Sequence, residues 1–485
     1  MPTVSLTLIR PGDDAPELFW ARRCADRSFL GGFHAFFAGG VEPVDRDIAE
    51  DFEFEDAALR VAAIRETFEE CGLLFGNGEI QRYSRSERTD EVVANAGGNL
   101  DLERLEPLGW WRMPKFLDVA YTTAFFGVRL TEGEAAQVDD LADQLDESEF
   151  DSGQWIDATQ ALEKWHRGEV FLTKPIHCLV DTVAAADGVP KSFPSPESFG
   201  ETPKRAGTSA AGEICGGVVM LPLKTPTLPP ATHTNCIVVG KQQLVVIDPG
   251  PSDPDDLAPL LDHLERRDGR LEAIALTHHH PDHVGGVQAL TERWDVPVIA
   301  HPKTLELLPD IASLRTGAID DGDTIEVDHP GELVAHFTPG HAPGHLAFHQ
   351  PDIDMVIGGD LVASRGTIIV DPPEGDMGDY LESLHRVLEM NPRVLMPAHG
   401  QMTTRPDELL KHYIDHRKMR EQKVVDALEQ FGPATTKELV PKVYSDAPKA
   451  VYPIAERSLL AHLLDLQQRQ IAQQSDGCWL LVIGC

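Results

Sequence analysis

Short apolar runs alternate with helix-periodic stretches through the second half of the chain. Runs of this length are typical of buried strands, and their alternation with helical patterns is the rhythm of a layered α/β domain. Polar residues follow several of the runs, at strand ends where loops commonly carry chemistry. The apolar runs are CIVVG, QLVVIDPG, LEAIALT, PVIAH, MVIGGD and RVLMPAHG.

The first part of the chain also mixes the two periods. The strand-like runs VSLTLI and TTAFFGVRL flank a helical stretch, AALRVAAIRETFEECGLLF, which predicts an α/β domain over residues 1–187. Residues 188–212 are rich in Pro, Gly and Ser and have no hydrophobic period, so they predict a linker. The layered α/β domain then occupies residues 213–410.

Residues 411–485 form a third segment. Three helical patterns, HRKMREQKVVDALEQF, TTKELVPKVY and AERSLLAHLLDLQQRQ, precede two short strands, IAQQS and CWLLV. Three helices followed by a strand pair are the outline of a winged helix. The presumed recognition helix has only Arg457 and Arg469 as cations, balanced by Glu456 and Asp465. Nucleic-acid binding and a packing or dimerisation role both stay open, the latter compatible with a homo-oligomer.

The composition is that of an ordinary soluble globular protein. A chain of 485 residues is too long for one core, and it contains no apolar stretch of the ~18 residues that a membrane span needs. No export signal is recognised, so we expect a cytoplasmic protein without a membrane partner. The seven cysteines lack C-x-x-C spacing, which argues against a disulfide framework and a zinc knuckle.

The formal charge of −37 is unusual. An acidic surface repels polyanions at long range, so a generic nucleic-acid binder is not indicated. Adaptation to a salty cytoplasm is the favoured explanation of this charge, and it says nothing about the substrate.

Candidate chemistry concentrates in THHHPDH, where His278, His280, Asp282 and His283 form an H-x-H-x-D-H pattern. The alternating His278 and His280 can reach one metal ion, while the adjacent Asp282 and His283 point elsewhere and can reach a second. Imidazole ligands suit zinc. Further candidate ligands follow other apolar runs, and Asp248 is expected to orient the cluster from outside. These further ligands are His341, Asp360 and His399.

With this motif and its distant partners, residues 218 to about 404 resemble the metallo-beta-lactamase fold, an αββα sandwich. The resemblance implies two Zn²⁺ ions, with Asp360 as the bridging ligand. Two such ions generate hydroxide from a bridging water and stabilise charge on an attacked carbonyl or phosphoryl group, with Asp282 in the catalytic set. His345 either binds substrate or assists the leaving group, or makes a structural hydrogen bond. The implied ligands are His278, His280 and His341 for one ion, and Asp282, His283 and His399 for the other.

The metal domain with its tail resembles the beta-lactamase-like protein 2 family. That resemblance implies an endoribonuclease for single-stranded RNA, in which the hydroxide attacks a phosphodiester. The glyoxalase II type has a nearly identical metal site but a different helical tail. Hydrolysis of a thioester or ester such as acyl-coenzyme A, with glyoxalase II-like chemistry, therefore remains the alternative.

The stretch AAIRETFEECGLLF carries a second candidate site. On a helix, Glu66, Glu69 and Glu70 stand at i, i+3 and i+4, hence on one face. Carboxylates suit Mg²⁺ or Mn²⁺, although a solvated acidic face is the plain alternative. The stretch, with Phe37-Ala38-Gly39-Gly40 before it, resembles a Nudix box.

The Nudix resemblance implies an α/β/α domain that binds the cation through the three glutamates, with Glu69 catalytic, and hydrolyses nucleoside or coenzyme A diphosphates. The full Nudix box begins with G-x5-E before the arginine, but this sequence has Asp51 and Ala57 at those two positions. An inactive Nudix domain in a nucleotide-sensing regulator is the remaining alternative. The expected whole is a multidomain α/β protein with a Nudix domain, a metallo-beta-lactamase sandwich and a C-terminal winged helix.

Overall fold

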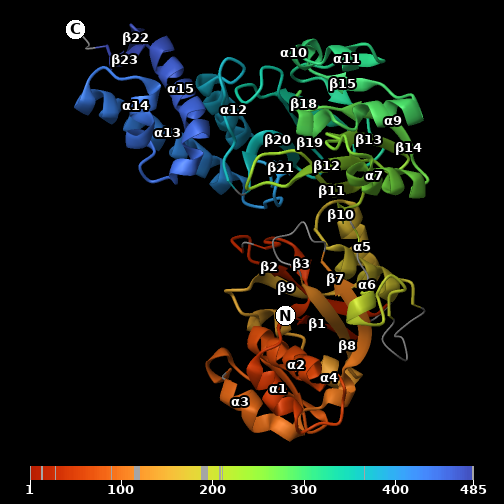
Figure 1. The fold of residues 1–485 in the computed structure, drawn as a ribbon. Coiled ribbons are helices and arrows are strands. Elements are labelled where there is room, and N and C mark those ends of the chain that lie inside the picture. Colours follow the sequence, from red (N-terminus) through yellow and green to blue (C-terminus); the bar gives the residue numbers. More distant parts are fainter. Residues whose placement is uncertain are drawn as a thin grey trace. The chain divides into compact units, whose positions relative to one another are not determined.

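The computed structural model describes residues 2–12, 15–27, 29–88, 90–113, 121–186, 195–206, 209, 211–364 and 366–482. The chain divides into two compact units, residues 1–219 and 220–485, and most of their elements are labelled in Figure 1. Of the expected linker, residues 188–194, 207, 208 and 210 lie outside the described part of the chain. No helix among the described residues is long and apolar enough to cross a membrane.

The first unit is built on one mixed sheet. Its strand order is β3-β2-β1-β8-β7, with β4 also paired to β1 and β9 to β2. β1 runs parallel to β8 and antiparallel to β2 and β4. The runs VSLTLI and TTAFFGVRL form β1 and β8, as predicted. The strands are β1 (Pro2–Arg10), β2 (Glu17–Arg23), β3 (His34–Ala35), β4 (Phe37–Gly40), β7 (Glu106–Arg112), β8 (Thr122–Arg129) and β9 (Phe150–Asp157).

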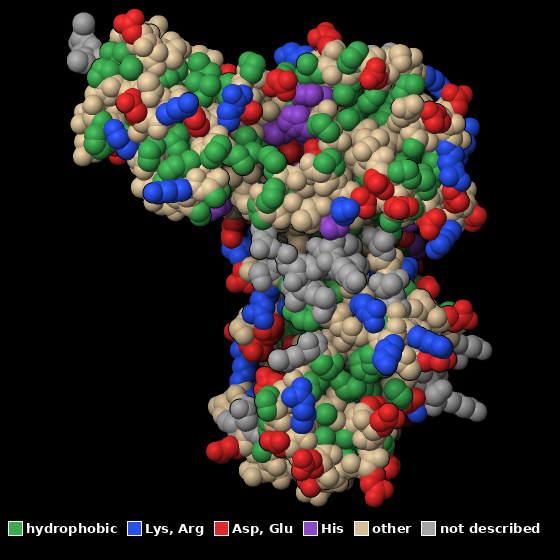
Figure 2. All heavy atoms as spheres, in the orientation of Figure 1, with side chains coloured by type: hydrophobic (Ala, Val, Ile, Leu, Met, Phe, Trp, Pro, Cys, Tyr) green, Lys and Arg blue, Asp and Glu red, His purple; other side chains and the backbone are tan. Residues whose placement is uncertain are grey.

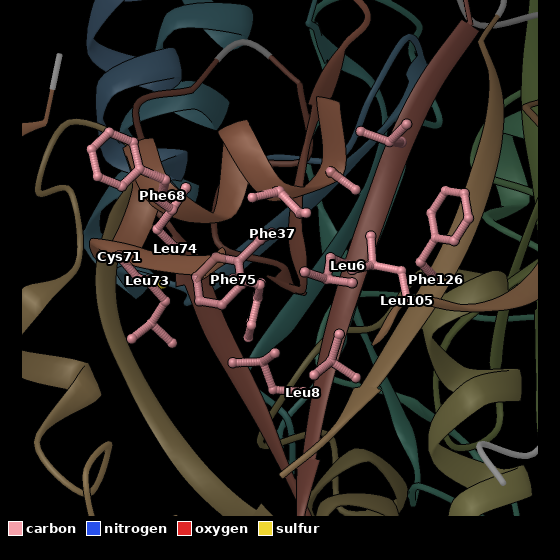
Figure 3. Close-up of a cluster of buried hydrophobic side chains, with 14 of the residues drawn as sticks. Leu6, Leu8, Phe37, Phe68, Cys71, Leu73, Leu74, Phe75, Leu105 and Phe126 are labelled. Atoms are coloured by element: carbon pink, nitrogen blue, oxygen red, sulfur yellow. The ribbon is translucent and has the colours of Figure 1, made fainter. Parts of the chain in front are cut away.

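Helix α2 (Ala57–Cys71) packs against this sheet, and most of its side chains are buried. The helix ends at Gly72, whose φ of 78° suits glycine, so the predicted continuation through Leu73, Leu74 and Phe75 is wrong. Those three residues belong to strand β5 (Leu73–Gly76), which pairs with β6 (Glu79–Arg82). Figure 3 shows their side chains with Leu6, Leu8 and Phe126 of the sheet, in one apolar core.

The other helices of this unit are short. Helix α1 lies within residues 41–56, between β4 and α2, and packs against α2. The helices are α1 (Pro43–Ala49), α3 (Asp90–Ala96), α4 (Glu132–Ala135), α5 (Ala158–His166) and α6 (Lys174–Ala184), and the last strand is β10 (Gly212–Cys215).

The second unit begins with two sheets. The first has the order β11-β12-β13-β14-β15-β16, in which β13 to β16 run parallel and are connected partly through α7 and α9. The predicted runs CIVVG, QLVVIDPG, LEAIALT and PVIAH all form strands of this sheet. Its elements are β11 (Val218–Lys224), β12 (His233–Val239), β13 (Gln243–Ile247), β14 (Arg270–Ala275), β15 (Val298–Ala300), β16 (Thr316–Ala318), α7 (Pro254–Arg266), α8 (Pro281–Val284), α9 (Val287–Trp294), α10 (Pro302–Glu306) and α11 (Pro309–Ala312).

The second sheet has the order β17-β18-β19-β20-β21, and its outer strand β21 contacts β12 of the first sheet. Helices α12 and α13 pack against β20 in a core that includes Tyr380 and Tyr413. This arrangement is the expected sandwich. Its elements are β17 (Thr324–Ile325), β18 (Leu333–Phe337), β19 (Leu346–Gln350), β20 (Met355–Ala363), β21 (Val394–His399) and α12 (Met377–Met390).

A winged helix closes the chain. Its core joins three helices to a two-stranded wing around Trp479, as predicted. The first helix begins at Pro406, before the expected boundary at Lys411, and its early residues pack on the sandwich. The elements are α13 (Pro406–Phe431), α14 (Thr436–Val443), α15 (Tyr452–Gln468), β22 (Ala472–Ser475) and β23 (Cys478–Leu481).

Candidate metal centre

The histidine cluster follows strand β14, which delivers the chain to Thr277. His278 and His280 lie in the loop after it, whereas Asp282 and His283 lie in the short helix α8. The sequence predicts loops after the apolar runs, and this prediction is wrong for the last two residues. The helical turn after Pro281 directs Asp282 and His283 to a separate group of side chains.

His278, His280, His341 and Asp360 form the first group, with ligand atoms close enough to share one ion. The His278 Nε2 and His341 Nε2 atoms each lie 3.0 Å from His280 Nδ1. Asp360 Oδ2 lies 3.4 Å from His341 Nε2. The structure thus brings together four residues that are up to 82 positions apart along the chain.

Asp282, His283 and His399 form the second group. The His399 Nε2 atom lies 3.5 Å from Asp282 Oδ2 and 3.2 Å from Asp360 Oδ1. The latter oxygen also lies 3.6 Å from His283 Nε2. One carboxylate oxygen of Asp360 therefore faces each group, which is the geometry of a bridging ligand.

Asp360 was expected at the end of an apolar strand, but it lies inside β20. The pairing of β20 with β21 shifts register on both sides of Gly359, whose φ is 51°. A Cβ at Gly359 would lie 2.6 Å from His345 Nε2, so glycine is required there. This irregularity turns the Asp360 carboxylate toward the histidines.

Hydrogen bonds outside the cluster fix which ring nitrogen faces the centre. His283 Nδ1 donates to Asp248 Oδ2 at 2.8 Å, His341 Nδ1 to the Ile369 carbonyl at 2.7 Å and His399 Nδ1 to the His233 carbonyl at 2.9 Å. When the ring is neutral, its Nε2 atom then presents a lone pair to the centre.

Asp248 contributes several of the hydrogen bonds that surround the cluster. Its carboxylate also accepts hydrogen bonds from the Thr277 amide at 2.8 Å and from Thr277 Oγ1 at 2.6 Å. These contacts are those expected of a residue that orients the cluster from outside.

The electrostatics of the centre favour a cation. Burial, reinforced by neighbouring imidazoles, holds the pKa of His278 far below its usual value and that of His280 at about 2, so both rings are neutral. Burial opposes charge on His283, yet the Asp248 and Asp360 carboxylates raise its pKa to about 9. Burial likewise opposes charge on Asp360, but His399 and His283 keep its pKa well below the usual value.

The residues present fit a metal pair. His283 Nε2, Asp360 Oδ1 and His399 Nε2 are buried without a hydrogen-bond partner, although they converge on one point. Buried polar atoms that lack partners are costly, and a shared cation removes that cost. The fold and this His/Asp cluster together indicate a dinuclear metal site.

His345 is completely buried beneath the cluster. Its Nδ1 atom lies 2.8 Å from Thr338 Oγ1, and its Nε2 atom accepts a hydrogen bond from the Asp360 amide at 3.1 Å. Burial lowers its pKa to about 3, with His341 adding to the effect. With both nitrogens occupied inside the protein, this placement favours the structural hydrogen bond over a catalytic role.

A cavity of about 870 Å³ opens on the centre, and its wall includes Asp282, His341 and Asp360. Figure 2 shows histidine side chains gathered in a hollow with hydrophobic side chains around it. The opposite wall comes from the winged helix, through Tyr413, Tyr444 and Arg457 among others. Sequence reasoning missed this wall, because no local pattern shows which helix will face the metals.

Sequence reasoning also missed Glu374, in the segment between β20 and α12. Its carboxylate lies 3.0 Å from His279 Nε2 and 4.0 Å from His280 Nε2, at the cavity wall. A third histidine in the THHHPDH stretch was the signal that could have prompted a search for such a partner.

The glutamates of the first unit lie on α2 beside strand β4. Glu70 accepts a hydrogen bond from the Ala38 amide at 3.1 Å, and a Cβ at Gly39 would lie 2.0 Å from Glu66. Burial raises the pKa of Glu70 well above its usual value and that of Glu66 to about 7, against the attraction of Arg65. Among the described residues, all groups whose ligand atoms already converge on one point lie in the second unit.

Comparison with known proteins identifies the second unit. The family described as metallo-beta-lactamase superfamily matches residues 229–399, and the beta-lactamase associated winged helix domain matches residues 435–479. The lactamase-like protein vrtG of Penicillium aethiopicum is 30% identical over 267 residues, which cover 53% of this chain and 82% of that protein. The chain therefore belongs to the metallo-beta-lactamase superfamily and is a metal-dependent hydrolase.

Other relatives have more specific names. A beta-lactamase-like protein 2 homolog of Caenorhabditis elegans is 27% identical over 225 residues, covering 45% of this chain and 73% of that protein. An atrochrysone carboxyl ACP thioesterase of Aspergillus fumigatus is 28% identical over 221 residues, covering 43% of this chain and 66% of that protein.

Solved structures agree on the fold of the second unit. A beta-lactamase domain protein from Burkholderia ambifaria aligns with a TM-score of 0.50 at 21% identity, over 56% of this chain and 93% of that chain. A NUDIX hydrolase from Alicyclobacillus acidocaldarius aligns at 25% identity over 39% of this chain and 92% of that chain, but the TM-score of 0.33 does not establish a shared fold.

Proposed function

We propose that the second unit hydrolyses the thioester of a small-molecule carrier, with acyl-coenzyme A as the substrate class and two zinc ions as cofactors. The observation that carries this proposal is the cavity of about 870 Å³ that ends at the convergent His/Asp cluster. Its size is that of small-molecule sites, which span roughly 300 to 1,000 Å³. The similarity to a protein named as an acyl-carrier thioesterase supports the same chemistry.

Single-stranded RNA, which the resemblance to beta-lactamase-like protein 2 implies, has less support. Phosphate backbones need free cations, but the arginines of the cavity wall are engaged within the protein. Arg417 donates to the Ile368 carbonyl, and Arg420 donates to the Val443 carbonyl at 2.9 Å and pairs with Asp446 at 2.7 Å. Arg457 pairs with Asp371 and donates to the Pro372 carbonyl at 2.6 Å.

The ligand residues divide the work of the proposed reaction. When bound, a pair of zinc ions supplies a nucleophilic hydroxide near neutral pH and stabilises charge developing on the attacked carbonyl. Asp360 connects the two groups of ligands, because each of its carboxylate oxygens faces one of the groups. Asp248 keeps the His283 ring oriented, and the winged-helix wall limits water around the substrate.

A direct assay separates the two substrate classes. Wild type and Asp282→Ala are incubated with dodecanoyl-coenzyme A, with free thiol as the readout, and with end-labelled single-stranded RNA, with products sized on a gel. We expect thiol release by wild type, lost in Asp282→Ala and retained in Asp268→Ala, an exposed aspartate of the same unit. RNA cleavage that depends on Asp282, without thiol release, would reverse the assignment.

We further propose that the first unit hydrolyses a nucleoside or coenzyme A diphosphate with Mg²⁺ or Mn²⁺. The specific observation in its favour is that Glu66 and Glu70 are held side by side against β4, where burial disfavours their charged forms. A divalent cation bound by the glutamates would compensate that cost, because carboxylate oxygens are its preferred ligands.

A further inference from the structure

We infer that the start of the last winged-helix helix and the loop before β12 form the binding site for the acyl chain of the substrate. We call this surface the acyl seat and define it by Leu228, Val451 and Ile454. The inference rests on the proposed thioester hydrolysis and names the part of the substrate that the winged helix recognises. It assigns the winged helix a role in substrate selection.

The side chains of the acyl seat are large, apolar and open to solvent. Leu228 is 56% exposed, Val451 40% and Ile454 42%. All three line the cavity whose wall also includes Asp282 and Asp360. Apolar surface left in water inside a cavity of this kind is stabilised when a hydrocarbon group covers it.

The acyl seat is linked to the metal centre partly along the chain and partly by two contacts. Val451 ends a short 3-10 helix (Lys449–Val451) and immediately precedes α15, so Val451 and Ile454 are three residues apart at its first turn. One turn later, Arg457 of α15 pairs with Asp371. That segment follows Ile369, whose carbonyl accepts the hydrogen bond from His341 Nδ1. An acyl chain on the seat would therefore have its carbonyl directed along this wall toward the centre.

The charges of the cavity favour an apolar occupant over a phosphorylated one. The arginines that line it are paired with protein groups, and Asp371 and Glu374 add carboxylates to the wall. His416, on the same wall, is neutral, because burial and then Arg417 lower its pKa to about 4. The acyl chain then occupies the cavity, and the phosphates of the carrier stay outside it.

The experiment compares chain lengths. Acetyl-, octanoyl- and dodecanoyl-coenzyme A are hydrolysed by wild type, Val451→Ala, Ile454→Ala and the control Ile471→Ala, another winged-helix residue, which is 38% exposed but does not line the cavity. A buried methylene contributes a factor of about four to affinity, so kcat/KM of wild type should rise steeply with chain length. Ile454→Ala should lose about tenfold on the dodecanoyl substrate and less than about twofold on acetyl.

A second measurement tests the acyl seat independently of the proposed thioester hydrolysis. Displacement of a fluorescent fatty-acid probe by dodecanoate is measured on the same four proteins. Dodecanoate binding that weakens in Ile454→Ala but not in Ile471→Ala supports the acyl seat, even if no thioester is hydrolysed and the proposed function falls. Equal rates for all chain lengths, or equal losses in Ile454→Ala and Ile471→Ala, would overturn the acyl seat and leave thioester hydrolysis standing.

Discussion

At the scale of single residues, the metal centre depends on side chains that do not themselves face it. Asp248 accepts three hydrogen bonds, two from Thr277 and one from His283, and it adopts a positive φ of 52°. Positive φ is uncommon outside glycine but is tolerated by aspartate. Asp248 thus combines an unusual backbone conformation with a carboxylate that accepts three hydrogen bonds, and these bonds fix the positions of Thr277 and His283.

Asp248→Asn should weaken zinc binding by roughly 10- to 100-fold, the usual cost of losing such an outer partner. The new amide would present a donor to His283 Nδ1, which is itself a donor, and so disturb the ring that supplies Nε2 to the centre. Competition with a coloured chelator measures the affinity. The matched variant Asp268→Asn should bind zinc like wild type, and equal affinities for the two variants would refute the role of Asp248.

At the scale of elements, the apolar runs predicted the strands of the sandwich, because a short and continuous apolar run is the local signature of a buried strand. The kink of β20 at Gly359 could not be predicted in the same way, because it arises from pairing with β21. Likewise, α13 begins at Pro406 because its first turns pack on the sandwich core, which the pattern of the tail alone does not reveal.

Helix α15 contains a buried histidine, His462. Its side chain is fully buried, and neither ring nitrogen is hydrogen-bonded. Burial, with Arg417 next in importance, lowers its pKa to about 3. The unfolded chain takes up the proton near pH 6.5, so the stability from this neutral ring is full above that pH and is lost as the pH falls toward 3.

His462→Leu should reduce that acid-side loss and raise the free energy of unfolding by about 1 to 3 kcal/mol, since the unsatisfied nitrogens disappear. Urea unfolding of wild type and variant between about pH 7 and about pH 5 measures both effects. Loss of the same stability in both proteins over that interval would contradict this account of His462.

At the scale of the whole molecule, the chain joins two compact units, for which we propose different chemistry. The candidate ligands that the sequence singled out come together in the structure, because H-x-H-x-D-H and its three distant partners are an uncommon combination. The sequence could not show the wall of the cavity, because Arg457 and Val451 reach the cavity only through the packing of α15 in the folded unit. The net charge of −37 described the surface but could not show that the arginines near the centre are paired.

Because each unit has its own core, their activities should be separable. Glu69→Gln should suppress diphosphate hydrolysis by at least about tenfold while thioester hydrolysis changes by less than about twofold, and Asp282→Ala should do the reverse. Glu53→Gln, an exposed glutamate of the first unit, is the control. Loss of both activities in either variant would contradict separate sites.

The central claim is that Asp360 joins two metal-binding groups into one centre. The most direct test is the zinc content of purified wild type and Asp360→Ala, measured by inductively coupled plasma mass spectrometry after dialysis. We predict about two zinc ions per chain in wild type and about one or none in the variant, since both groups lose a ligand. Two zinc ions retained by Asp360→Ala, or none bound by wild type, would contradict the claim.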